Sequence, residues 1–149
     1  MKKSNLFYIF PIIFFFSTYV NYLSGNIGIL PIDSFAFFDT SFLILKGYHP
    51  LKDFWITTGF LVDYIQSFFF KILGVSWFSY VAHAAFFNFF FTICLFFFFY
   101  YNKLNLYISL FYSLAISILF YPNIGTPFAY HHSFLFSLLS VIILLQIIK

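Results

Sequence analysis

Four runs of apolar residues, each close to the length of a bilayer core, limit this chain to a membrane-spanning helical fold. A transmembrane helix needs about 20 predominantly apolar residues, and the runs cover residues 6–23, 76–101, 104–121 and 133–149. Only 7% of the 149 residues are charged, against about 25% in an ordinary soluble domain. We therefore expect an all-α, polytopic membrane protein with about four transmembrane helices in a single membrane domain, residues 1–149.

The N-terminal run favours an uncleaved helix over a signal peptide. It extends from Leu6 to Leu23, longer than the core of a typical signal peptide, and no clear cleavage site of small residues follows. Cytoplasmic ends of membrane proteins are enriched in Lys and Arg. Lys2 and Lys3 therefore predict a cytoplasmic N-terminus and an outward first crossing.

The stretch from Thr57 to Gly74 decides the topology, because its length would also allow it to cross the membrane. Its polar side chains share one side of a helical wheel, which is typical of an amphipathic helix in the interface plane. That side is formed by Asp63, Gln66, Ser67 and Lys71. If this helix does not cross, Lys103 and Lys149 also lie on the cytoplasmic side, as the positive-inside rule favours.

Residues 24–75 then form an external loop with two interfacial helices, and residues 122–132 form a second external loop. The first interfacial helix is expected to begin near Asp33, which follows Pro31, and to continue to about Lys46. Both loops are expected on the periplasmic or external side of a bacterial inner membrane.

All four acidic residues of the chain lie between Asp33 and Asp63. Because charge is costly in hydrocarbon, such a cluster indicates a candidate functional site. Asp33 is interpreted either as a helix cap or as a general base at the membrane surface. Asp53 belongs either to an interface loop or to a site in which Lys52 balances a lipid phosphate. Asp39 follows Asp33 by six positions, about 120° away on one helix, so these two are not expected to form a pair.

The histidines allow a second hypothesis. His49, His131 and His132 all fall in the expected external loops, where they could bind a metal ion together with Asp33 or Asp53. Their spacing does not require such a site. Polar loop histidines are the simpler interpretation, and no metal site is predicted.

Two polar residues, His83 and Asn88, lie inside the second apolar run. Polar groups within a membrane usually face other helices, so this helix is expected to pack inside the bundle. The net charge of +3 comes from scattered lysines, and nucleic acid is therefore not expected as a partner. Cys94 is the single cysteine, which excludes a disulfide within the chain.

The order of several short motifs is distinctive. A first helix is followed by a loop that opens with an acid, a Gly-x-x-Pro-x-x-Asp-Phe segment and an amphipathic helix ending in Leu-Gly. The residues that carry this order are Asp33, Gly47, Pro50, Asp53, Phe54, Gly59 and Gly74. This part of the chain resembles the C-type membrane glycosyltransferases, above all the dolichyl-phosphate-mannose–protein mannosyltransferase and lipid-A aminoarabinose-transferase branch.

The resemblance implies a transferase that uses a polyprenyl-phosphate-linked sugar at an external active site. It makes Asp33 the catalytic acid of the first external loop and Lys52 the contact of the lipid phosphate. The other expected substrate-binding residues are Tyr48, His49, Asp53 and Trp55. No cofactor is expected, although a divalent cation could neutralise the phosphate. Relatives have many more spans, so the chain is expected to be the N-terminal portion of a larger fold.

A second hypothesis belongs to a different class of protein. The chain could be a small non-catalytic membrane subunit, or a truncated remnant, that packs its aromatic helices against the helices of a partner membrane subunit. Both hypotheses place the chain in the lipid bilayer.

Overall fold

The computed structural model describes residues 4–27, 31–56 and 59–148, and all the regular elements within them are helical. Six α-helices and one 3-10 turn follow one another: α1 (Ser4–Ile27), α2 (Pro31–Leu45), α3 (Leu61–Leu73), α4 (Trp77–Tyr101), α5 (Leu106–Leu119), η1 (Tyr121–Asn123) and α6 (Ala129–Ile147). The all-α prediction is confirmed.

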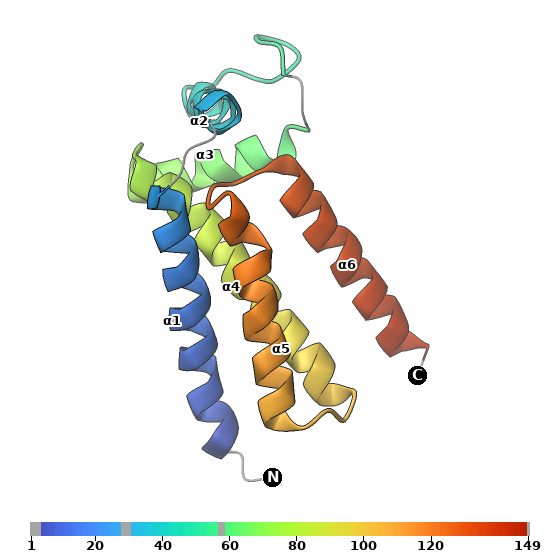
Figure 1. The fold of residues 1–149 in the computed structure, drawn as a ribbon. Helices are drawn as coiled ribbons and strands as arrows, with labels where there is room; N and C mark the ends of the chain where they lie inside the picture. The colour runs from blue at the N-terminus through green and yellow to red at the C-terminus, as the bar shows by residue number, and fades with distance from the viewer. Residues whose placement is uncertain (1–3, 28–30, 57–58, 149) are drawn as a thin grey trace.

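Four helical segments are long and apolar enough to cross a membrane, as the sequence predicts. They are Phe7–Ile27, Trp77–Tyr101, Leu106–Asn123 and Ala129–Ile147. In Figure 1, α1, α4 and α5 run side by side, whereas α6 leans away from them toward its C-terminal end. The start of α1, the α4–α5 turn and the end of α6 lie at one end of the bundle, and α2 and α3 lie at the other. The chain is thus an integral membrane protein.

The fourth span starts earlier than the sequence predicts. It begins at Ala129 rather than at residue 133, because Pro127 and the extended residue Phe128 end the preceding segment. The placement of His131 and His132 in an external loop was therefore wrong. Both histidines lie in the first turn of α6, and both are buried.

The first span also extends beyond its predicted end at residue 23 and reaches Ile27. Contacts from other elements hold this last turn in place. The indole Nε1 of Trp77 donates a hydrogen bond to the carbonyl oxygen of Gly25 at 2.9 Å, and in the turn before it Asn21 Nδ2 donates to the carbonyl oxygen of Gly125 at 3.2 Å. Local sequence carries no sign of these long-range partners.

The two helices expected in the first loop are present, and they lie across the end of the bundle (Figure 1). α2 ends before Gly47, whose φ of +93° suits a residue without a side chain. α3 packs against α2 and α4. The apolar face of α3 is the exposed one, with Phe68 and Ile72 uncovered, as suits a helix in contact with lipid.

The polar face of α3 differs from the sequence expectation. The sequence assigns Asp63 to the polar face of an interfacial helix, but its side chain is only 1% exposed. Gln66 and Ser67 are also buried, whereas Lys71 remains exposed. Because α2 and α4 cover this face, the polar side chains of α3 point into the protein and must find partners there.

Small polar side chains fill the contact between α1, α4 and α5. The fully buried ones are Ser17, Asn21, Asn88, Thr92, Ser109, Ser113 and Ser117. Asn88 Nδ2 donates hydrogen bonds to the carbonyl oxygens of Ser17 and Ser117, each at 3.0 Å. The prediction that the second span packs inside the bundle is confirmed. Small residues let helices approach one another closely. This packing matters in lipid because apolar surface alone does not favour contact with another helix over contact with lipid.

The end of α1 meets the segment after η1 backbone to backbone. A Cβ atom built on Gly25 would lie 2.8 Å from the carbonyl oxygen of Gly125 and 2.8 Å from Val81. Gly125 has a φ of +75°, and a Cβ there would overlap the backbone of Gly25 and Ser24. The Ser24 hydroxyl also donates to the carbonyl oxygen of Pro122.

Candidate functional site

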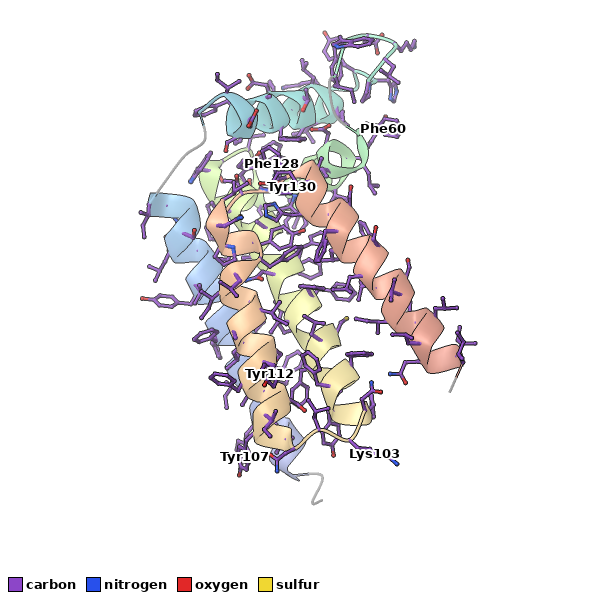
Figure 2. All side chains as sticks on the ribbon, turned by 45° about the vertical axis from the view of Figure 1, so that its right-hand side comes forward. Phe60, Lys103, Tyr107, Tyr112, Phe128 and Tyr130 are labelled. Atoms are coloured by element: carbon purple, nitrogen blue, oxygen red, sulfur yellow. The ribbon has the colours of Figure 1, made fainter. Side chains whose placement is uncertain are left out.

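Three of the four carboxylates in the chain line a single cavity of about 340 Å³ between α2 and α3. We call it the acidic cleft. Its lining residues are Asp33, Ala36, Phe37, Asp39, Thr40, Trp55, Ile56, Asp63 and Phe128. The cleft lies at the end of the bundle where Phe128 is labelled in Figure 2, opposite the end that holds Lys103. Within the part of the chain that the structure describes, no Lys or His side chain lines it.

The spacing of α2 explains how the cleft is lined. Asp33, Ala36, Phe37 and Thr40 are three or four positions apart and share one face of the helix. Asp39 lies on the flank of that face, yet it lines the same cavity. Asp33 and Asp39 thus line one cavity, although the expectation that they would not form a carboxylate pair stays a prediction.

Asp63 is the buried carboxylate of the cleft. Its Oδ1 accepts a hydrogen bond from Thr40 Oγ1 at 2.5 Å. Burial raises the pKa of Asp63 from the usual 3.8 to about 6, although hydrogen bonds from Thr40 and Ser41 oppose the rise. Asp33 and Asp39 are exposed in the same cleft. The cleft therefore combines one buried acid with two solvated ones.

The structure brings two of the predicted site residues into the cleft and leaves four outside it. Asp33 and Trp55 line the cavity. Trp55 is 79% exposed, so its ring is available to a ligand. The four that do not line it are Tyr48, His49, Lys52 and Asp53.

Those four residues belong to the exposed segment between α2 and α3. Asp53 Oδ2 accepts a hydrogen bond from the backbone N–H of His49 at 2.8 Å, which closes a turn within the segment. His49 Nδ1 lies 3.2 Å from the hydroxyl of Tyr64. Leu51 adopts a φ of +66° at the tip. The observed partner of the Asp53 carboxylate is thus its own turn.

A second polar cluster, which we call the histidine clasp, joins three helices of the bundle. Gln66 Oε1 lies 2.8 Å from His83 Nδ1, and His83 Nε2 lies 3.0 Å from His132 Nε2. His132 Nδ1 lies 3.0 Å from the carbonyl oxygen of Phe128. The clasp therefore links α3, α4 and α6 through side chains that are almost fully buried.

Hydrogen counting fixes the tautomers of a neutral clasp. Since the Phe128 carbonyl can only accept, His132 Nδ1 donates to it, and His132 Nε2 then accepts from His83 Nε2. His83 Nδ1 is left as an acceptor, so Gln66 must present its amide NH₂ there, with the positions of Oε1 and Nε2 exchanged. In the present orientation the buried Gln66 Nε2 has no hydrogen-bond partner, which favours that exchange. The orientation with Oε1 toward His83 suits a clasp that carries one extra proton.

The histidines do not assemble a metal site with the carboxylates. Among the residues that the structure describes, no three His, Cys, Asp or Glu side chains lie close enough together to hold a metal ion. His131 Nε2 instead pairs with Asn123 Oδ1 at 3.0 Å. The metal hypothesis built on His49, His131 and His132 therefore has no geometry to support it within those residues.

Comparison of the chain with protein-family models, with curated proteins and with solved structures found no match.

Proposed function

We propose that the chain is a glycosyltransferase, or part of one, that moves a sugar from a polyprenyl-phosphate donor to an acceptor outside the cytoplasm. The observation that carries the proposal is the acidic cleft, which gathers Asp33, Asp39 and Asp63 at one end of a membrane-spanning bundle. A donor anchored in the bilayer by its prenyl chain could bring its sugar to that level. The motif order that resembles the C-type enzymes supports the same assignment.

The proposed reaction is an inverting displacement at the anomeric carbon. Asp33 either accepts the proton of the acceptor hydroxyl or orients that hydroxyl toward the sugar. Trp55 offers an aromatic face at the rim of the cleft, which suits contact with a sugar ring. The phosphate leaving group is acidic and needs little protonation, but it needs a compensating charge.

Two sources of that charge can be separated by experiment. Lys52 is exposed in the segment between α2 and α3, and a divalent cation carried by the donor phosphate is the alternative, since such ions bind one or two carboxylates together with phosphate. Activity that survives EDTA but falls on Lys52→Ala assigns the charge to the lysine. The opposite result assigns it to the cation.

Replacing Asp33 by Asn is expected to lower donor turnover by at least about 100-fold, because a positioned carboxylate contributes roughly 10²–10⁴-fold. The chain is reconstituted into liposomes with polyprenyl-phosphate-linked mannose or aminoarabinose, and the release of polyprenyl phosphate is measured with water as acceptor. Asp53→Asn is the matched control, since Asp53 lies outside the cleft. Full turnover by the Asp33→Asn variant would remove the assigned role.

We also propose that the acidic cleft faces the periplasm or exterior, with the N-terminus in the cytoplasm of a bacterial cell. Lys103 lies at the end of the bundle opposite the cleft (Figure 2), and cytoplasmic ends are enriched in lysine. In a Cys94→Ser background, Lys52→Cys is expected to react with an impermeant maleimide in intact cells, and Lys103→Cys only after permeabilisation. The reverse pattern would place the cleft in the cytoplasm and contradict an external transferase site.

A non-catalytic subunit is the second candidate function, and α6 favours it. The buried residues of this helix all lie near its start, namely His131, His132 and Leu135. Several of its later apolar residues are exposed, among them Ile143 and Ile147, so a helix of a partner membrane subunit could pack there. This function predicts no donor turnover by the purified chain and no effect of Asp33→Asn on its membrane assembly.

A further inference from the structure

We propose that Asp63 receives the proton of the acceptor during sugar transfer, and that Asp33 orients the acceptor across the same cleft. This inference rests on the proposed function and assigns its proton-accepting step to a residue that sequence patterns had placed on a polar surface. Both carboxylates line the acidic cleft, Asp63 from α3 and Asp33 from α2. Their surroundings differ, and that difference separates their roles.

The carboxyl group of Asp63 is held in one position. It is 1% exposed, and its Oδ1 lies 2.5 Å from Thr40 Oγ1 across the contact between α2 and α3. A base that acts on a bound acceptor needs such fixed geometry. Asp33, by comparison, is exposed in the first turn of α2, where water competes with a bound acceptor for hydrogen bonds to its carboxylate.

Counting the hydrogens at Thr40 shows that the site accommodates the proton-bearing form of Asp63. Thr40 Oγ1 lies 2.5 Å from Asp63 Oδ1, 2.9 Å from the carbonyl oxygen of Ala36 and 3.2 Å from that of Phe37. The hydroxyl has one hydrogen to give. If Asp63 is protonated, it donates to Thr40, and Thr40 donates to a backbone carbonyl. If Asp63 is ionised, Thr40 must turn its hydrogen toward the carboxylate and leave the carbonyls.

The basicity of Asp63 also suits the step. Burial raises its pKa to about 6, against hydrogen bonds from Thr40 and Ser41. At neutral pH the group is mostly ionised and ready to accept a proton, and its affinity for that proton exceeds that of a carboxylate in water. General bases work best when their pKa lies near the working pH.

The titratable groups around Asp63 come from two helices. Asp33 and Asp39 of α2 share the cleft, and Tyr80 of α4 interacts with Asp63 electrostatically while its hydroxyl donates to the carbonyl oxygen of Ser34 at 2.9 Å. From the start of α6 the cleft receives only Phe128. Among the described residues, no positively charged side chain that would favour the ionised form of Asp63 lines the cleft.

The step balances without any further reactant. The acceptor hydroxyl gives its proton to the Asp63 carboxylate while its oxygen forms a bond to the anomeric carbon. The bond between that carbon and the phosphate oxygen breaks, and its electron pair leaves with the phosphate. Asp63 then releases the proton to water in the open cleft, which restores the carboxylate.

The test is the pH dependence of polyprenyl phosphate release by the full chain in liposomes, with the polyprenyl-phosphate sugars named above and water as acceptor. We expect wild-type turnover to rise with pH through a midpoint near 6. Asp63→Asn should lose roughly 10²–10⁴-fold and the pH-dependent limb with it. Thr40→Val should shift the midpoint to higher pH, because it removes a hydrogen bond that lowers the pKa of Asp63. Asp33→Asn should be slow but keep the midpoint.

Each outcome bears on a different part of the proposal. Turnover by Asp63→Asn with the wild-type midpoint overturns the base assignment and leaves the transferase intact. A midpoint that disappears in Asp33→Asn and persists in Asp63→Asn assigns the proton to Asp33 and likewise overturns it. A wild-type chain that releases no polyprenyl phosphate overturns the transferase function, and the base assignment falls with it. Thermal unfolding of each variant confirms that the protein compared is folded.

Discussion

The Asp63→Asn variant is expected to unfold at a higher temperature than the wild-type protein at pH 7.5, with no such gain near pH 4. Burial raises the pKa of Asp63 in the folded state from 3.8 to about 6. Between these values the folded protein binds more protons than the unfolded one, so stability falls as the pH rises. Above pH 6 Asp63 is ionised in both the folded and the unfolded state. The loss in the free energy of unfolding then stays constant, at about 3 kcal/mol for a pKa shift of this size.

Asparagine avoids that loss because it is neutral at every pH and nearly isosteric with the acid. The NH₂ group of the asparagine can donate a hydrogen bond to Thr40 Oγ1, as the protonated carboxyl group of Asp63 does. The measurement is thermal unfolding in detergent across pH 4–8, with Asp53→Asn as a control of equal chemistry at an exposed position. Equal unfolding temperatures of Asp63→Asn and wild type at both ends of the range would show that the carboxylate is not desolvated.

Replacing Gly125 by Ala is expected to destabilise the bundle by at least about 2 kcal/mol. Two unfavourable effects add in this variant. Alanine would have to adopt a φ of +75°, and its Cβ would overlap the backbone of Gly25. Each effect alone costs about 1–3 kcal/mol. The end of α1 would have to move away from the segment after η1. Thermal unfolding in detergent measures the effect.

Substitutions at two other glycines separate the cost of backbone strain from the cost of the Cβ overlap. Gly47 has a φ of +93°, but a Cβ atom added there would have no other atom within 4 Å, so Gly47→Ala reports backbone strain alone. Gly59 has open space and no such φ, so Gly59→Ala should change little. If Gly125→Ala costs no more than Gly47→Ala, the close approach of α1 and the segment after η1 does not contribute.

The membrane-spanning helices could be predicted from the sequence because hydropathy is a local property. Length and apolar composition locate four spans without reference to their neighbours. The start of α6 could not be placed in the same way. His131 and His132 are polar enough to suggest a loop, and only the tertiary partners Asn123 and His83 make it favourable to bury them in a helix.

The acidic cleft was predictable in part. The concentration of carboxylates between Asp33 and Asp63 pointed to the right segment, and Asp33 and Trp55 were expected in the site. The burial of Asp63 in the cleft was missed because a helical wheel shows which side chains share a face but not what covers that face. The available signal was that a carboxylate, an amide and a hydroxyl gathered on one side of an otherwise apolar helix need a polar partner.

The histidine clasp has a mechanical consequence for α6. The other three spans adhere along their length through small polar side chains, whereas the buried residues of α6 are confined to its start. His132 therefore fixes the start of the helix, whereas farther along only partly buried side chains pack against the core, namely Leu138, Leu139 and Ile142. Through His83 the same contact connects the start of α6 to Gln66, which lies one helical turn from Asp63 on α3. A displacement at the start of α6 would therefore be transmitted to α3, the helix that carries Asp63.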